Sequence, residues 1–357
     1  MRIAGFVIGA LGGLLLAGFA HAEPLRIGVA APLSGSSSIL GEQIRDGAEE
    51  AAADRGTAKL QIADDGCTAE GGAKAARQFS EAKVQAVVGF LCGDAVEAAL
   101  PILKDANIPV ITVGVRTDSL TDRRNKTGWP VFRLAPRADG EREATGRLLT
   151  KLWRNELFAV IDDGTIYGRE LAESFRSAAE REGLKPVFID TFRPQLDNQI
   201  GLVGRLRKAE AGCVFAGGDR DDIAIMARDA QKIGAEMIFA GGETLRAAAG
   251  PVPLAPGTLM IGLPEWQEVA DKAVVAKFSD RGIVPEGYVL PTYAAIQVAL
   301  AALEEAGSNG DLMKALTGHE FQTAIGPIRF DSKGDLSQNP YRVFRYDGKR
   351  FVQVEMQ

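Results

Sequence analysis

Short apolar runs rich in β-branched residues alternate along the chain with longer stretches whose apolar positions recur at helical spacing. This alternation is typical of βαβ units, in which parallel strands form a sheet and the intervening helices cover its two faces. The sequence therefore predicts an α/β protein. The first series of expected strands comprises residues 25–31, 59–64, 85–90 and 109–113.

The same alternation restarts after a predicted crossover near residues 131–137. Residues 258–266 then indicate a return towards the first unit, and the last segment, YRVFRYDGKRFVQV, predicts a β-hairpin around Asp347-Gly348. The expected strands of the second series comprise residues 157–162, 185–190, 213–218 and 236–242. The two helices expected after them comprise residues of about 267–281 and 289–306.

The two series predict two doubly wound parallel-sheet lobes with several chain crossings between them. Such crossings form a hinge and leave a cleft, and ligands of open sheets bind beyond the carboxyl ends of the strands. We expect the N-terminal lobe to comprise residues 23–135 and 263–328, and the C-terminal lobe residues 136–262 and 329–357.

The first 22 residues have the pattern of a secretory signal peptide. Arg2 precedes an apolar run, and Ala20-His21-Ala22 places small residues at the −3 and −1 positions of a cleavage site. We therefore expect cleavage after Ala22 and export of a soluble chain. A later apolar run, residues 289–307, contains proline and polar residues and is interpreted as a core helix.

Composition argues against several other classes of protein. The net charge is −6, and no basic patch is interleaved with aromatic residues, so we expect no nucleic-acid partner. His21 lies in the signal peptide and His319 stands alone, which leaves no set for a His-based triad or zinc site. Ser34–Ser38 lacks a base partner, and the acidic cluster lacks the spacing of a calcium loop. We expect no enzyme, no cofactor and no metal; the acidic cluster is Asp219, Asp221 and Asp222.

Three cysteines remain in the exported chain. Cys92 lies in GFLCGDAVEA, where a strand runs into a helix, a position that would also suit a nucleophile or a metal ligand. An oxidising compartment favours pairing, and Cys67 and Cys92 each follow the end of a predicted strand. If those strands are neighbours, a disulfide fits and contributes about 3 kcal/mol. Cys213 lies within an apolar strand and is expected to be a free, buried thiol.

Short motifs distributed over nearly the whole mature chain resemble those of the leucine/isoleucine/valine-binding proteins, periplasmic receptors of amino-acid ABC transporters. The resemblance implies the type I periplasmic binding fold with a three-crossover hinge, a disulfide between Cys67 and Cys92, a periplasmic location and a membrane permease as partner; we expect a monomer. The motifs are IGVAAPLSG (27–35), DDGCTAE (64–70), VVGFLCG (87–93), IPVITVG (108–114), IYGREL (166–171), FAGGE (239–243), PTYAAIQ (291–297) and IGPIRFDSKGDL (325–336).

The resemblance also implies a set of ligand-binding positions. The family binds the ligand's α-carboxylate at two turns, which correspond here to Cys92-Gly93-Asp94 and Val115-Arg116-Thr117. Free N–H groups at a helix start suit an anion. The remaining matches are an ammonium-binding glutamate, an aromatic that closes over the ligand, and two positions of the side-chain pocket: Glu243, Tyr167, Tyr288 and Leu40.

Three positions depart from the family's pattern. Gly93 replaces a serine, Asp219 replaces an aromatic residue, and Arg116 is unusual in an aliphatic pocket. Each also suits a local role: a tight turn, a helix N-cap and the rim of the cleft. If Asp219 and Arg116 face the cleft they need partners, because an unpaired charge in a closed site is costly.

We therefore expect a receptor that closes on a free amino acid with a polar or mixed side chain. The alternatives are a receptor for an aromatic or aliphatic carboxylate and a ligand sensor with the same fold. Glu243 argues against a carboxylate without an amine, because its buried charge would then lack a cation.

Overall fold

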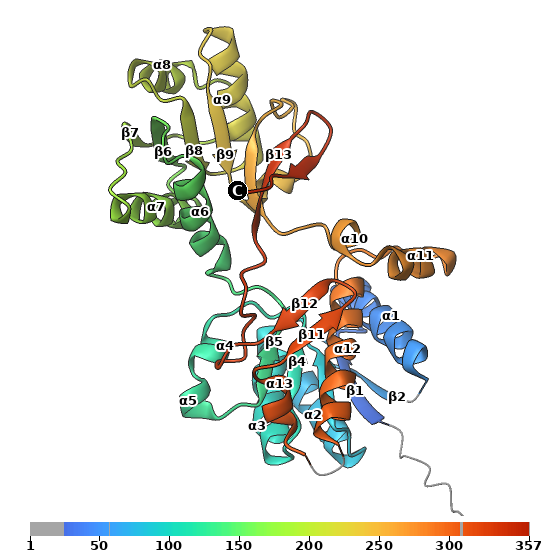
Figure 1. Cartoon of the computed structure of the whole chain (residues 1–357). Helices are drawn as coiled ribbons and strands as arrows, with labels where there is room; N and C mark the ends of the chain where they lie inside the picture. Colours follow the sequence, from blue (N-terminus) through green and yellow to red (C-terminus); the bar gives the residue numbers. More distant parts are fainter. Residues whose placement is uncertain (1–24, 57, 308–309, 357) are drawn as a thin grey trace, which may run out of the picture.

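The computed structural model describes residues 25–56, 58–307 and 310–356. It consists of two α/β lobes, at the bottom and top of Figure 1, and the chain crosses between them three times. The predicted α/β class and the division into two lobes are confirmed. The predicted signal peptide lies outside the described residues. Within those residues, no helix combines the length and apolarity needed to cross a bilayer.

The first lobe is built on a five-stranded parallel sheet with the order β2-β1-β3-β4-β5. Helices α1 (Ser38–Arg55) and α12 (Val289–Ala306) pack on one face, and α2 (Ala69–Glu81) and α3 (Gly93–Asp105) pack on the other. Most of α12 is buried, so the predicted core helix is confirmed. The strands are β1 (Leu25–Ala31), β2 (Ala58–Asp64), β3 (Ala86–Gly89), β4 (Val110–Thr112) and β5 (Val131–Arg133).

Shorter elements complete this lobe, and one of them differs from its prediction. The helix expected at about 267–281 is two helices, because Asp271 interrupts it and caps the second by accepting a hydrogen bond from the Ala273 N–H, at 2.8 Å. The short elements are α4 (Ser119–Asp122), α5 (Arg124–Thr127), α10 (Trp266–Val269), α11 (Lys272–Asp280), α13 (Leu312–Leu316), β11 (Glu320–Thr323) and β12 (Gly326–Arg329).

The second lobe has a seven-stranded sheet with the order β14-β13-β10-β9-β8-β6-β7. Helices α6 (Gly140–Leu152) and α7 (Ile166–Arg181) cover one face, and α8 (Ile200–Lys208) and α9 (Arg220–Lys232) cover the other. The predicted C-terminal hairpin is confirmed as the antiparallel pair of β13 and β14. The strands are β6 (Phe158–Asp162), β7 (Phe188–Thr191), β8 (Cys213–Gly217), β9 (Ile238–Gly241), β10 (Leu259–Gly262), β13 (Arg342–Tyr346) and β14 (Phe351–Gln353).

The expected disulfide between Cys67 and Cys92 is present, with a Cα–Cα distance of 5.2 Å, and Cys213 is free and buried. One premise of that prediction is wrong. Strands β2 and β3 are not neighbours, because β1 lies between them. The bridge therefore links the loops that follow the two strands on either side of β1, and it fixes this edge of the sheet across three strands.

A buried ion pair determines which residue of the chain is the last to belong to the first lobe before the third crossing. Arg133 is fully buried and pairs with Asp335 at 2.6 Å, and Phe330 packs in the first lobe's core. The first lobe therefore extends beyond the expected boundary at residue 328, and the third crossing follows Leu336. Arg137, on the first crossing, also pairs with Asp335, at 2.9 Å, so these contacts hold two of the three crossings together.

Candidate ligand-binding cleft

Two turns of the first lobe meet at the carboxyl ends of its strands. Gly93 begins α3, whose first amides have no acceptor within the helix. A Cβ atom added at Gly93 would find one neighbour within 4 Å, the Thr117 Oγ1 atom at 3.8 Å. The structure thus brings Gly93 and Thr117 together and leaves open space beside Gly93. Their amide and hydroxyl groups form a surface suited to a carboxylate.

The other residues of these turns take different positions. Asp94 and Thr117 are exposed, whereas the Val115 side chain is 3 % exposed and packs in the core with α3. Val115 can therefore offer a ligand only its backbone. The Thr117 carbonyl accepts a hydrogen bond of 2.6 Å from Arg133, which ties this turn to the buried ion pair.

In the second lobe, Glu141 joins the predicted residues Tyr167 and Glu243. Glu141 lies in the first turn of α6 and is 8 % exposed. Its Oε1 atom accepts one hydrogen bond from the Tyr167 hydroxyl and one from the Glu243 N–H, both at 2.7 Å. Burial raises the pKa of Glu141, and burial together with the Glu141 charge raises the pKa of Tyr167. Glu141 was not identified from the sequence.

A second unpredicted residue, Tyr341, connects the two lobes across the cleft. The Arg116 guanidinium of the first lobe donates a hydrogen bond to the Tyr341 hydroxyl, and its Cζ atom lies 5.9 Å from the centre of the ring. The Tyr341 hydroxyl in turn donates to Glu243 Oε2 at 3.4 Å. Burial and the Glu243 charge raise the pKa of Tyr341. The Tyr341 hydroxyl therefore links the Arg116 guanidinium of the first lobe to the Glu243 carboxylate of the second.

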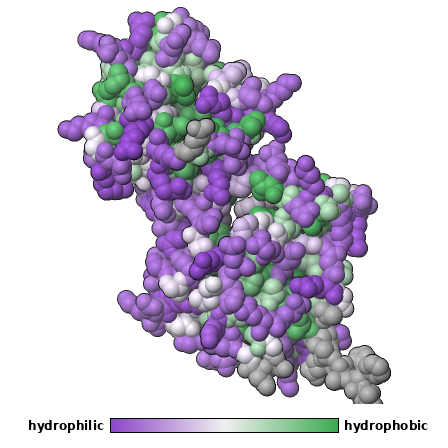
Figure 2. Space-filling view, viewed as in Figure 1, coloured by the Kyte–Doolittle hydropathy of each residue, from purple (hydrophilic) through white to green (hydrophobic). Residues whose placement is uncertain are grey.

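A cavity of about 320 Å³ lies between the lobes and is lined by Glu243 and Tyr288, two of the predicted residues. Tyr288 precedes α12, and its N–H donates to Gln43 Oε1 at 3.1 Å. Burial raises the pKa of Tyr288, although the Arg116 charge opposes that shift. The narrow waist between the lobes is visible in Figure 2. The other lining residues are Arg246, Leu263, Pro264, Glu265, Trp266, Gln267, Pro285, Glu286 and Gly287.

Leu40 and Asp219 lie at the starts of helices in different lobes. Leu40 is half-buried in the first turn of α1. Asp219 precedes α9 as its N-cap residue but is exposed, and its side chain accepts no capping hydrogen bond. Among the described residues, Asp219 forms no ion pair with Arg116, so the two charges do not neutralise each other.

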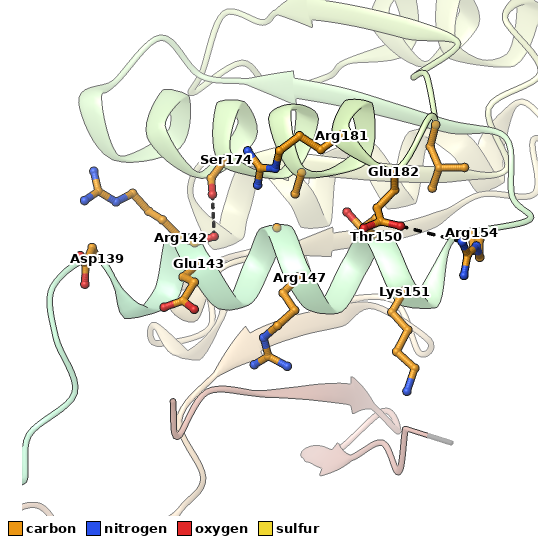
Figure 3. Close-up of a pocket in the computed structure, with 13 residues that line it drawn as sticks. Asp139, Arg142, Glu143, Arg147, Thr150, Lys151, Arg154, Ser174, Arg181 and Glu182 are labelled. Carbon is orange, nitrogen blue, oxygen red and sulfur yellow. Dashed lines mark hydrogen bonds and ion pairs between the residues drawn. The ribbon is translucent and has the colours of Figure 1, made fainter. Parts of the chain in front are cut away.

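A larger groove of about 870 Å³ lies elsewhere, over α6 and α7 of the second lobe (Figure 3). None of the predicted ligand-binding residues lines it. Charged side chains surround it, and the Ser174 hydroxyl donates to the Arg142 carbonyl at 2.7 Å. The groove is open to solvent along the two helices and lacks the converging groups found between the lobes. We therefore place the candidate site in the cleft.

The acidic cluster near Asp219 has a structural role in the second lobe. Asp222 is 2 % exposed, and its Oδ1 atom accepts a hydrogen bond from the Gln195 N–H at 2.8 Å. Burial raises the pKa of Asp222. In the part of the chain that the structure describes, no three His, Cys, Asp or Glu residues converge as metal ligands.

Comparisons with known proteins agree with this geometry. Residues 24–350 match the sequence pattern of the family described as periplasmic binding protein. A protein of Pseudomonas aeruginosa named "Amino acid binding protein" is 32 % identical over 340 residues, covering 90 % of each chain. "Leu/Ile/Val-binding protein homolog 3" of Brucella melitensis is 29 % identical and covers 95 % of this chain and 96 % of its own.

A solved structure shows the same fold. The ABC transporter substrate-binding protein of Desulfitobacterium hafniense, in complex with Leu, superposes with a TM-score of 0.65 at 22 % identity. The superposition covers 92 % of this chain and 99 % of that chain.

Proposed function

Because the chain belongs to the family of periplasmic binding proteins, we propose that it is the periplasmic receptor of an ABC importer, which closes on a free amino acid and delivers it to a membrane permease. The family membership confirms the resemblance, the type I binding fold and the expectation that the protein is not an enzyme. We also propose that the receptor is a monomer and that its signal peptide is cleaved after Ala22.

The environment of Glu243 is the observation that best supports an amino acid as the ligand. Its carboxylate is half-buried and lines the cavity between the lobes. Among the described residues, no lysine or arginine forms an ion pair with it: Arg246 pairs with Glu265, and Arg116 contacts Tyr341. A carboxylate in a closing cleft needs a cation, and the ammonium of an amino acid supplies one while its carboxylate meets the turns at Gly93 and Thr117.

We propose that the ligand's side chain is polar or mixed rather than branched and apolar. Arg116 supports this preference because it brings a guanidinium to the cleft, next to the turn that holds Thr117. Asp219 supports it less, because it is exposed at the start of α9. An apolar side chain placed against Arg116 would desolvate the guanidinium without replacing its hydrogen bonds.

A thermal-shift screen of the twenty amino acids and benzoate tests this proposal. A ligand present at a hundredfold excess over its dissociation constant stabilises the folded state by about 2.7 kcal/mol. We expect the largest stabilisation from a polar amino acid. Stabilisation by leucine, isoleucine and valine alone would contradict the side-chain preference, and stabilisation by benzoate alone would contradict the ammonium site.

Substitution Glu243→Gln then tests the ammonium contact, using the best amino acid from the screen. The amide keeps the size of the side chain and removes its charge, so we expect affinity to fall about tenfold or more. Glu268→Gln is the matched control, because Glu268 lies on α10 and pairs with Arg350 at 3.0 Å outside the cavity. Equal affinities of the two variants in titration calorimetry would place the cation elsewhere.

A further inference from the structure

A second cavity of about 320 Å³ lies at the hinge, on the other side of the second crossing from the cleft. Pro264 and Trp266 line both cavities, so this crossing is the wall between them. None of the residues predicted to bind the ligand lines the hinge cavity. Its lining residues come mainly from the hairpin of β11 and β12, the short helix α10 and the segment before β13. Figure 1 shows where these elements lie in the fold.

The walls of the hinge cavity come from the three crossings and from the β11–β12 hairpin, and they combine polar and apolar surface in nearly equal amounts. A volume of this size suits a small molecule, and walls of this mixed kind favour one with an apolar body and a polar head group. Leu134 and Ile328 are buried in the core of the first lobe, and Ile325, Trp266 and Leu336 pack against that core, so the cavity lies where this core meets the crossings. The apolar lining residues are Leu134, Pro264, Trp266, Val269, Ile325, Pro327, Ile328, Leu336 and Pro340.

One end of the hinge cavity carries a positive charge without an acidic partner. Arg342 is half-buried, and its Nη1 atom donates to the carbonyls of Asn339 and Tyr341, at 2.8 and 3.0 Å. Within the described residues it forms no ion pair with a carboxylate. Burial lowers the pKa of Arg342, and so does the charge of Arg147. The other charged residues of the lining, Glu320 and Arg329, lie opposite each other in the register of β11 and β12, and within the described residues their side chains form no ion pair.

We propose that the hinge cavity is a second binding site, which takes a small amphipathic anion. The apolar body of the anion packs between Trp266, Val269 and Ile328, and its acidic head group accepts hydrogen bonds from Arg342. A guanidinium left half-buried without a carboxylate gains a charge-assisted hydrogen bond when such a head group binds. This site is separate from the amino-acid cleft, so it does not depend on the function proposed above.

The test uses the full mature chain labelled with 5-fluorotryptophan, and octanoate and its neutral analogue octanamide as probes. Substitution Trp266→Phe assigns the ¹⁹F resonance of Trp266. We expect octanoate to shift that resonance saturably, because Trp266 lines the cavity. Arg342→Gln should weaken octanoate binding by about tenfold and leave octanamide binding unchanged, because only octanoate carries the charge.

Three variants separate the hinge cavity from the cleft. Val269→Glu introduces a carboxylate into the cavity at a side chain that is 46 % exposed, and it should abolish octanoate binding. Val284→Glu is its control, because Val284 is 62 % exposed and does not line the cavity. Arg116→Gln removes the guanidinium of the cleft and should leave octanoate binding intact. Absence of a saturable shift, equal octanoate affinity in Arg342→Gln, or a loss confined to Arg116→Gln would overturn the proposal.

Discussion

The two lobes have the same strand order but hold equivalent loops by different means. The first lobe's β2-β1-β3-β4-β5 corresponds to β7-β6-β8-β9-β10 in the second, which adds β13 and β14 at one edge. In the first lobe, the loops after β2 and β3 are joined by the Cys67–Cys92 disulfide. In the second lobe, the loop after β7 is joined to the first turn of α9, the helix that follows β8, by the hydrogen bond from the Gln195 N–H to Asp222.

This difference matches what each lobe offers to a ligand. The first lobe presents amides and a hydroxyl at Gly93 and Thr117, which are useful only if the backbone is fixed. The second lobe presents the side chains of Tyr167 and Glu243, and the Glu141 carboxylate accepts hydrogen bonds from the Tyr167 hydroxyl and from the backbone N–H of Glu243. If the proposed ligand contacts are right, the disulfide fixes the lobe that would bind the ligand through its backbone, and hydrogen bonds hold the lobe that would bind it through side chains.

The largest expected effect comes from removing the covalent link. Replacing both Cys67 and Cys92 by alanine should lower the free energy of unfolding by about 3 kcal/mol, because the unfolded chain is no longer constrained. Urea unfolding monitored by tryptophan fluorescence measures it. Cys213→Ala is the control for loss of a cysteine outside the bridge and should cost about 1 kcal/mol. Equal midpoints for the double variant and the wild type would show that the bridge does not stabilise the first lobe.

The corresponding link in the second lobe should contribute less. Asp222→Ala removes the buried carboxylate that accepts the hydrogen bond of the Gln195 N–H, which should lower the free energy of unfolding by about 1–3 kcal/mol. Asp222→Asn keeps an acceptor oxygen and removes a buried charge, so at neutral pH its stability should equal or exceed that of the wild type. Urea unfolding of the two variants at pH 7 checks this order, and a larger loss for asparagine would mean that the charge itself is needed.

Much of the fold could be predicted because it depends on local patterns. Alternating apolar runs locate the strands, and Cys67 and Cys92 follow strand ends that a disulfide can join. The end of the first lobe could not be predicted, because it depends on the pairing of Asp335 with Arg133, 202 positions apart. Burial of that pair, rather than any local pattern, brings residues 330–336 into the first lobe.

Residues of the candidate site that lie in family-like sequence motifs could be proposed from the sequence. Residues that reach the site only through tertiary contacts, Glu141 and Tyr341, could not. Glu141 lies in GEREATG, where an acidic residue in a first helical turn already suits the helix dipole, so its contacts with Tyr167 and Glu243 leave no sequence signal. Tyr341 precedes an ordinary strand, and its position against Arg116 results from the third crossing. Arg116 was identified as unusual, but its partner was not.

A smaller effect is expected from adding a side chain at Gly93, where we propose that the ligand's carboxylate binds. Gly93→Ser has room for its Cβ atom and places a hydroxyl beside Thr117, so it should raise amino-acid affinity about fivefold through one further hydrogen bond to the carboxylate. Gly201→Ser is the control, because a Cβ atom there meets no neighbour within 4 Å and Gly201 lies on α8, far from the cleft residues. Unchanged affinity in calorimetry for Gly93→Ser would indicate that the carboxylate binds elsewhere.

The smallest expected effect is an opposite dependence on pH at two carboxyl groups, Asp64 of the first lobe and Asp222 of the second. At the end of β2, burial alone would raise the pKa of Asp64, but hydrogen bonds from Ser34, Gly66 and Leu33 outweigh burial and lower it below its usual 3.8. The stability that Asp64 contributes is therefore present above pH 3.8 and is lost as the pH falls through its folded-state pKa.

Asp222 behaves in the opposite way, because burial raises its pKa above the usual 3.8. The folded state then binds the proton more tightly than the unfolded state, so stability is gained as the pH falls through the raised pKa, and the gain is complete below 3.8. Between pH 7 and 4, the wild type should gain stability relative to Asp222→Asn. Between pH 4 and 2, it should lose stability relative to Asp64→Asn. Unfolding midpoints at a series of pH values measure both differences, and slopes of the same sign for the two variants would contradict the contrast between Asp64 and Asp222.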